Sequence, residues 1–145
     1  MRTCRPILMV LLSAVLAFAG SKDVSLDELK ARLPSAKPDD QVQICITIAE
    51  RQVAAANELF RQNKSEEAQA AVRDVVTYSG QARDAAAVTG RRLKSTEIDV
   101  RKMAHKLDDI KRPLSLEDQA PVQAAITELE KIRTDLLNKM FKGGK

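Results

Sequence analysis

The fold of this chain is decided by residues 65–111, which read SEEAQAAVRDVVTYSGQARDAAAVTGRRLKSTEIDVRKMAHKLDDIK. Small or apolar residues recur there in alternating steps of about four and three, the spacing of a helix that packs along a partner helix. This apolar seam comprises Ala68, Val72, Val75, Ser79, Ala82, Ala86, Thr89, Leu93, Thr96, Val100, Met103, Leu107 and Ile110. The pattern predicts an all-α fold organised around this segment.

Two glycines leave open whether the segment is one helix. Gly80 and Gly90 each cost about 1 kcal/mol relative to alanine inside a helix, and Thr96 could cap a new helix after a break at Gly90. The seam nevertheless keeps its phase across both glycines. We therefore favour a long central helix over residues 65–111 with antiparallel flanking helices. The alternative is a compact four-helix bundle, in which the chain folds back near Gly90.

The flanking segments also have helical patterns. The remaining helices are predicted at about residues 25–33, 41–62 and 119–141, within one domain that spans residues 20–145. Ser25 and Glu28 form a capping box at the start of the first. The second carries two apolar stripes and should be covered on more than one side, with the first helix as the obvious cover. The stripe of the last helix includes Ile132 or Arg133.

One predicted helical hairpin resembles a pattern found in a known protein family. Ala56, Leu59, the turn Asn63-Lys64-Ser65, the run Glu66-Glu67-Ala68 and Val72 resemble a tetratricopeptide-type hairpin over residues 49–82. The resemblance is local, because Gly80 stands where that family has its closing proline and no second copy follows. It implies an antiparallel helix pair and, only weakly, a groove that binds peptides.

The first nineteen residues have the pattern of a signal peptide. Arg2 and Arg5 precede the apolar run Ile7–Phe18, and Ala17-Phe18-Ala19 supplies a small-x-small cleavage pattern. We expect export to the periplasm or the exterior, with cleavage near Ala19. An uncleaved anchor is the alternative, but the run is shorter than the roughly 20 apolar residues that span a bilayer. The mature chain is accordingly not expected to span a membrane.

Charge points to no particular class of partner. Loss of Arg2 and Arg5 from the 24 basic residues leaves a mature chain that nearly balances its 20 acidic residues. An exported chain also has little chance to meet nucleic acid, so none is expected as a partner.

A basic cluster with interleaved acids, for example Glu97 near Arg101, lies in the second half of the central segment. Its members are Arg91, Arg92, Lys94, Arg101, Lys102 and Lys106. This favours a solvated, ion-paired face; the alternative is contact with an anionic surface such as lipid headgroups.

Catalytic and metal-binding patterns are weak. His105 is the chain's one histidine and is predicted to face outward, two residues after Met103. A haem site would have to pair it with Met103 or Met140, and neither Cys-x-x-Cys-His nor a Gly-rich phosphate loop is present. We predict that the protein is not an enzyme and has no catalytic, cofactor, metal or small-molecule site.

After cleavage Cys45 is the single cysteine. It is either buried as a small apolar residue or joined to a second chain by a disulfide.

Two classes of function follow. The first is a structural or interaction protein of the cell envelope that binds a protein partner or itself. A homodimer is suggested by the two stripes of residues 41–62 and by Ile98, which lies off the seam; the compact four-helix alternative needs no dimer. The second class is a periplasmic chaperone-like or stress-type binder of unfolded chains.

Overall fold

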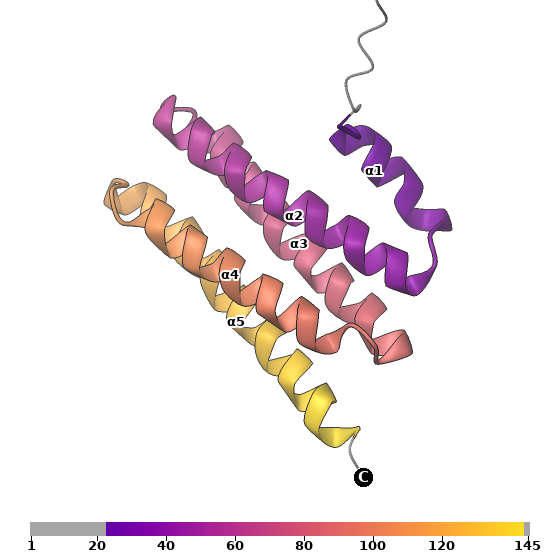
Figure 1. Ribbon diagram of the computed structural model, residues 1–145. Helices are drawn as coiled ribbons and strands as arrows, with labels where there is room; N and C mark the ends of the chain where they lie inside the picture. The colour runs from indigo at the N-terminus through magenta and orange to yellow at the C-terminus, as the bar shows by residue number, and fades with distance from the viewer. Residues whose placement is uncertain (1–22, 144–145) are drawn as a thin grey trace, which may run out of the picture.

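Five α-helices and one short 3₁₀-helix make up the part of the chain, residues 23–143, that the computed structural model describes (Figure 1). They are α1 (Leu26–Arg32), the 3₁₀-helix η1 (Leu33–Ser35), α2 (Pro38–Arg61), α3 (Ser65–Thr89), α4 (Leu93–Lys111) and α5 (Leu116–Lys142). No strand occurs within these residues. The predicted all-α fold is confirmed.

The prediction of one long helix over residues 65–111 is wrong, because the chain reverses at Gly90. This glycine has a φ of 71°, in the left-handed region, and its N–H donates to the Ala86 carbonyl at 2.9 Å. Glycine reaches this conformation without the steric cost of a Cβ and so ends the helix. The alternative is correct: α2, α3, α4 and α5 form a compact four-helix bundle.

The apolar seam is nevertheless correct. Of its thirteen members, all but Thr89 and Ile110 are buried; Ile110 is half-buried and packs against the core, whereas Thr89 is exposed beside the turn. The unbroken spacing of the seam suggested one continuous helix, but it has another cause: α3 and α4 both turn their part of the seam towards one shared core. A helix that folds back on itself therefore preserves the pattern as well as a straight one does.

Two antiparallel hairpins stack to form the bundle. The first is α2 with α3 and the second is α4 with α5; Figure 1 shows α2 and α4 in front, with α3 and α5 behind them. Because the hairpins are stacked in the same sense, α3 runs parallel to α5, and these two helices make the most extensive contact between the hairpins. α2 and α5 lie at opposite corners and make no contact.

The flanking helices begin earlier than predicted. α2 starts at Pro38 rather than residue 41, because proline is tolerated in a first helical turn. α5 starts at Leu116 rather than residue 119, since the Ser115 hydroxyl accepts from the Asp118 N–H at 3.3 Å and caps the helix. Ser25 caps α1 in the predicted way, accepting from the Glu28 N–H at 3.2 Å.

The short helix α1 covers the outer face of the first hairpin. Its Leu29 is buried, and the Lys30 ammonium lies 3.7 Å from Asp74 and 5.6 Å from the centre of the Tyr78 ring of α3. Both predicted stripes of α2 are thereby covered within one chain, and Ile98 is half-buried. The compact bundle therefore covers most of the α2 surface that suggested a homodimer, and the homodimer itself stays a prediction. Within residues 23–143 no helix combines the length and the apolar character needed to cross a membrane.

The two glycines of residues 65–111, Gly80 within α3 and Gly90 at its C-cap, provide a matched test of the turn. A Cβ on Gly80 would lie 4.0 Å from Ile132 Cδ1, an ordinary contact, so Gly80→Ala should raise the free energy of unfolding by about 0.5–1 kcal/mol. Gly90→Ala should lower it by about 1–2 kcal/mol, because alanine is strained at positive φ. Urea unfolding measures both. Stabilisation by both substitutions would contradict the turn, since a continuous helix gains from either alanine.

Candidate functional site

An apolar groove runs between the parallel helices α3 and α5 and is the main candidate binding surface. It encloses about 640 Å³. Buried Val72 and Ala125 form its floor, half-buried Val76 and Pro121 its walls, and exposed Ala124 its rim. The short alanine side chains leave the space between the two helices unfilled. We call this surface the α3–α5 groove.

Charged residues stand on both rims of the α3–α5 groove. Arg73 lies on α3 and makes no ion pair within residues 23–143. Glu128 lies on α5 and is paired with Lys131 at 2.6 Å. The apolar floor therefore lies beside one cation without a protein partner of opposite charge in the described chain.

A partly buried ion pair joins α4 to α5, and sequence spacing did not identify it. Glu97 was expected to pair with Arg101; instead its carboxylate, in a residue 6% exposed, accepts from Arg133 Nε at 2.6 Å. Hydrogen bonds to Glu97 and then to Glu130 raise the pKa of Arg133. Arg133 was an alternative to Ile132 on the stripe of the last helix. Ile132 enters the core, which leaves Arg133 at the core's edge to reach Glu97.

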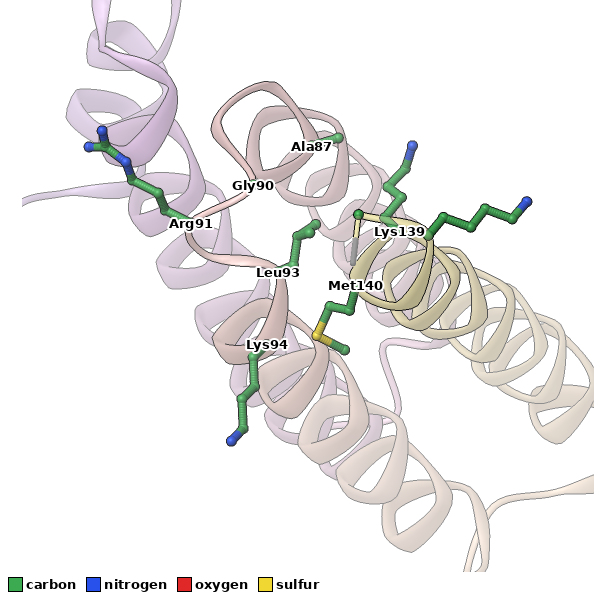
Figure 2. Close-up of a pocket in the computed structure, with 9 residues that line it drawn as sticks. Ala87, Gly90, Arg91, Leu93, Lys94, Lys139 and Met140 are labelled. Carbon is green, nitrogen blue, oxygen red and sulfur yellow. The ribbon is translucent and has the colours of Figure 1, made fainter. Parts of the chain in front are cut away.

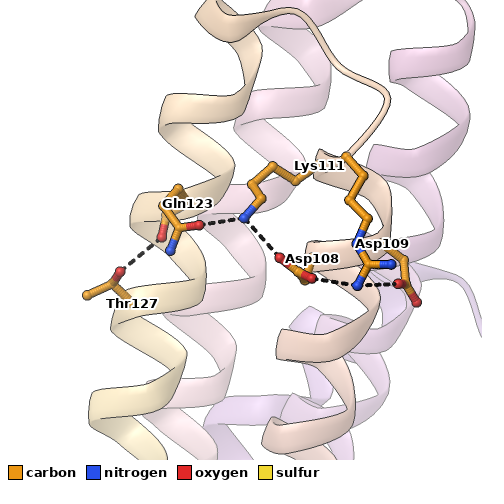
Figure 3. Close-up of polar contacts among 6 residues, drawn as sticks. Asp108, Asp109, Lys111, Gln123 and Thr127 are labelled. Carbon is orange, nitrogen blue, oxygen red and sulfur yellow. Dashed lines mark hydrogen bonds and ion pairs between the residues drawn. The ribbon is translucent and has the colours of Figure 1, made fainter.

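A solvated ion-paired cluster closes the opposite end of α4, as Figure 3 shows. Lys111 Nζ lies 2.9 Å from Asp108 and donates to Gln123 Oε1 of α5 at 2.6 Å. Arg112 lies 2.9 Å from Asp108 and 3.5 Å from Asp109. Hydrogen bonds from Lys111 and then Arg112 lower the pKa of Asp108. The partners of these two acids are Lys111 and Arg112, which lie outside the basic cluster named from the sequence.

The predicted basic cluster divides between the α3–α4 turn and the outer face of α4. Arg91 lies 3.9 Å from Asp39, Arg92 donates to Gln43 Oε1 at 3.3 Å, and Lys102 lies 4.0 Å from Asp99. Arg91 and Lys94 line a second hollow, together with Lys139 from α5 (Figure 2). Sequence reasoning missed the α5 contribution, because no local pattern places the end of α5 beside this turn.

The candidate haem ligands do not converge. His105 is exposed on α4, as predicted, whereas Met103 is buried in the core. Met140 lies near Leu93 at the α3–α4 turn, about three helical turns from His105 along α4. Within the described part of the chain, no group of three or more His, Cys, Asp or Glu side chains is placed to hold a metal ion.

Cys45 is a packing residue in the described fold. It is 1% exposed, and its Sγ lies 3.9 Å from Gln81 Oε1, at the inner wall of a hollow of about 450 Å³ beside η1. Burial raises the pKa of its thiol to about 11. An interchain disulfide would require this side chain to leave the bundle.

No family model, curated protein or solved structure matches the chain in the three comparisons. The structure itself places the protein among small four-helix bundles, built here from two stacked hairpins. The similarity of residues 49–82 to a tetratricopeptide hairpin stays a prediction.

The Glu97–Arg133 pair should be important for stability. Arg133→Met leaves the Glu97 carboxylate buried without its partner and should lower the free energy of unfolding by about 2–3 kcal/mol. Glu97→Met combined with Arg133→Met should recover a large part of this loss, because no charge remains to be desolvated. Urea unfolding of the two variants gives the comparison. If the free energy of unfolding fell equally in the single and double variants, the loss could not be due to a buried Glu97 carboxylate without its partner.

Cys45 should be chemically protected until the bundle opens. At pH 8 a disulfide reagent should react with the thiol slowly in the folded protein and quickly in urea, because the native thiol is buried and seldom ionised. The raised pKa also sets the sign of a pH effect on stability: its contribution is complete below about pH 9 and is lost as the pH rises towards 11. In residues 20–145, where Cys45 is the one cysteine, Cys45→Ala should abolish the reaction with the reagent. Rapid labelling under native conditions would contradict this placement.

Proposed function

We propose that this is an exported, non-catalytic interaction protein of the cell envelope, and that it binds an amphipathic helix of a protein partner in the α3–α5 groove. The observation that carries the proposal is the apolar floor of Val72 and Ala125, left open between two parallel helices. Helix-in-groove recognition uses this kind of surface, with apolar anchors of the partner at helical spacing.

The dimensions of the groove suit a short helical segment. Its lining residues run from 69 to 77 on α3 and from 121 to 128 on α5. At about 1.5 Å per residue this is a trough of roughly 10–12 Å, the length of about two helical turns. Arg73 on the rim suits an acidic residue next to the partner's apolar anchors.

Export is supported by the sequence alone. Residues 1–19, which carry Arg2, Arg5 and the apolar run, lie outside the described residues. Mass spectrometry of the protein from its native envelope should find a new N-terminus near Gly20. An intact Met1 terminus in a soluble cytosolic fraction would overturn export and leave the groove proposal standing.

The absence of catalysis is proposed from the chemistry of the surfaces. His105, the chain's one histidine, is exposed on α4, and the α3–α5 groove is lined by apolar, amide, hydroxyl and two charged side chains. This set is suited to binding an apolar surface and lacks an imidazole base beside a nucleophile.

Site-specific crosslinking tests the groove. A photoreactive residue at Ala124 should crosslink to one partner, and mapping of the crosslinked peptide should place it in an amphipathic helix. Ala124→Arg should weaken capture of that partner at least tenfold by putting a long cation over the apolar floor. Ala54→Arg is the matched control, because Ala54 is an exposed helical alanine on α2 outside the groove and should leave capture unchanged.

The other outcomes are also informative. Crosslinks spread over many unfolded chains would favour the chaperone-like alternative, and a crosslink to a second copy would identify a homodimer interface. Equal effects of Ala124→Arg and Ala54→Arg would overturn the groove as the binding site.

A further inference from the structure

A basic hollow lies at the end of the bundle where α3 turns into α4. It encloses about 660 Å³, with Leu93 and Met140 at its centre, and no acidic residue lines it. Four cationic side chains surround it: Arg91, Lys94, Lys139 and Lys142. Figure 2 shows Leu93 at the α3–α4 turn and Met140 at the end of α5, while the side chains of the labelled cations Arg91, Lys94 and Lys139 extend away from them.

These cations are poorly neutralised by the protein itself. Arg91 has one ion-pair contact, with Asp39 at 3.9 Å, and its side chain is 80% exposed. Lys94, Lys139 and Lys142 make no ion pair within residues 23–143. Other basic residues of the bundle differ in this respect: Arg83 lies 3.0 Å from both Asp84 and Asp135, whereas Arg73 has no ion pair within the described residues. What sets this end apart is that four cations gather around one hollow that no acidic residue lines.

The helix dipoles favour three of these four charges and leave Lys94 without an explanation. Lys139 and Lys142 lie in the last turn of α5, where cations are favourable. Arg91 directly follows the end of α3, where a cation is also favourable, and it lies 3.9 Å from Asp39. Lys94 lies in the first turn of α4, which carries no acidic residue, so its charge sits at the positive end of that helix without a local electrostatic reason.

Exposed apolar side chains accompany the cations. Phe141, in the last turn of α5 next to Met140, is 79% exposed. Val88, in the last turn of α3, is 73% exposed and borders the neighbouring hollow beside η1. The third large exposed hydrophobic residue in the described chain, Leu116, starts α5 at the opposite end. Apolar residues among basic ones suit a membrane interface, where headgroup phosphates meet the cations and the apolar side chains enter the acyl boundary.

We propose that this end of the bundle, with Arg91, Lys94, Lys139, Lys142, Val88 and Phe141, docks on an anionic lipid surface. A free phosphate would use the cations but leave Phe141 in water. An end-on orientation also leaves the α3–α5 groove, which runs along the side of the bundle, accessible to a partner. The membrane contact is thus additional to the proposed partner binding and does not depend on it.

Vesicle co-sedimentation of residues 20–145, which contain every described helix, tests the proposal. The protein should bind vesicles that contain phosphatidylglycerol and not those of phosphatidylcholine alone, and salt should weaken binding. Each basic residue near an anionic surface strengthens membrane binding about fivefold. Replacement of Lys94, Lys139 and Lys142 by Gln should therefore weaken binding about a hundredfold, and Phe141→Ser by several-fold.

Matched controls separate this end from diffuse charge. Replacement of Lys64, Lys106 and Lys131 by Gln removes the same charge from exposed positions elsewhere, and Leu116→Ser exposes a hydroxyl at the opposite end of the bundle. Both should leave binding within about twofold of the parent chain, with circular dichroism confirming that all variants fold.

Three results would overturn the proposal. One is no binding to phosphatidylglycerol vesicles. Another is equal loss in the two triple variants, which would indicate non-specific attraction by net charge. The third is loss in the Lys94 set with full competition by inorganic phosphate and no effect of Phe141→Ser, which would indicate a free-anion site rather than a membrane surface.

Discussion

The left-handed turn at Gly90 is the constraint on which the rest of the structure depends. Its φ of 71° stops α3 and sends α4 back along the bundle. Val75 and Ala82 of α3 then share one core with Val100 and Leu107 of α4. Small residues in the middle of α3 let the helices approach, and buried Ser79, Ala82 and Ala86 belong to that region. Without the reversal, these residues would need other partners to cover them.

The same reversal generates both candidate surfaces. By stacking the hairpins in one sense it places α3 parallel to α5, and the short side chains of Ala124 and Ala125 leave the α3–α5 groove open. It also brings the start of α4 beside the end of α5, which gathers Arg91, Lys94, Lys139 and Lys142 around one hollow. The side groove and the basic end, from which the two binding proposals are argued, are therefore two consequences of one topology.

Local pattern was sufficient to predict the helices and the buried faces. Periodicity reflects burial, and the hydroxyls of Ser25 and Ser115 cap their helices by accepting from backbone N–H groups three residues further on. It failed at Gly90, because the spacing of the seam residues continues unchanged across the turn, as it would in one straight helix. It also failed for Glu97, whose neighbour in sequence was Arg101 but whose partner in space is Arg133. The α3–α5 groove was not predictable from periodicity, because it requires knowing which helices lie side by side.

The distance between spin labels at Glu67 and Asp109 tests the central claim most directly. Ser65 and Gln69, near the start of α3, donate to Asp118 in the first turn of α5 at 3.0 and 3.3 Å, and a short turn joins α5 to the end of α4. The two labelled backbones therefore lie at the same end of the bundle. With helices packed about 10 Å apart, the separation should be roughly 20 Å or less. A straight helix over residues 65–111 would place them about 63 Å apart, and that result would contradict the account.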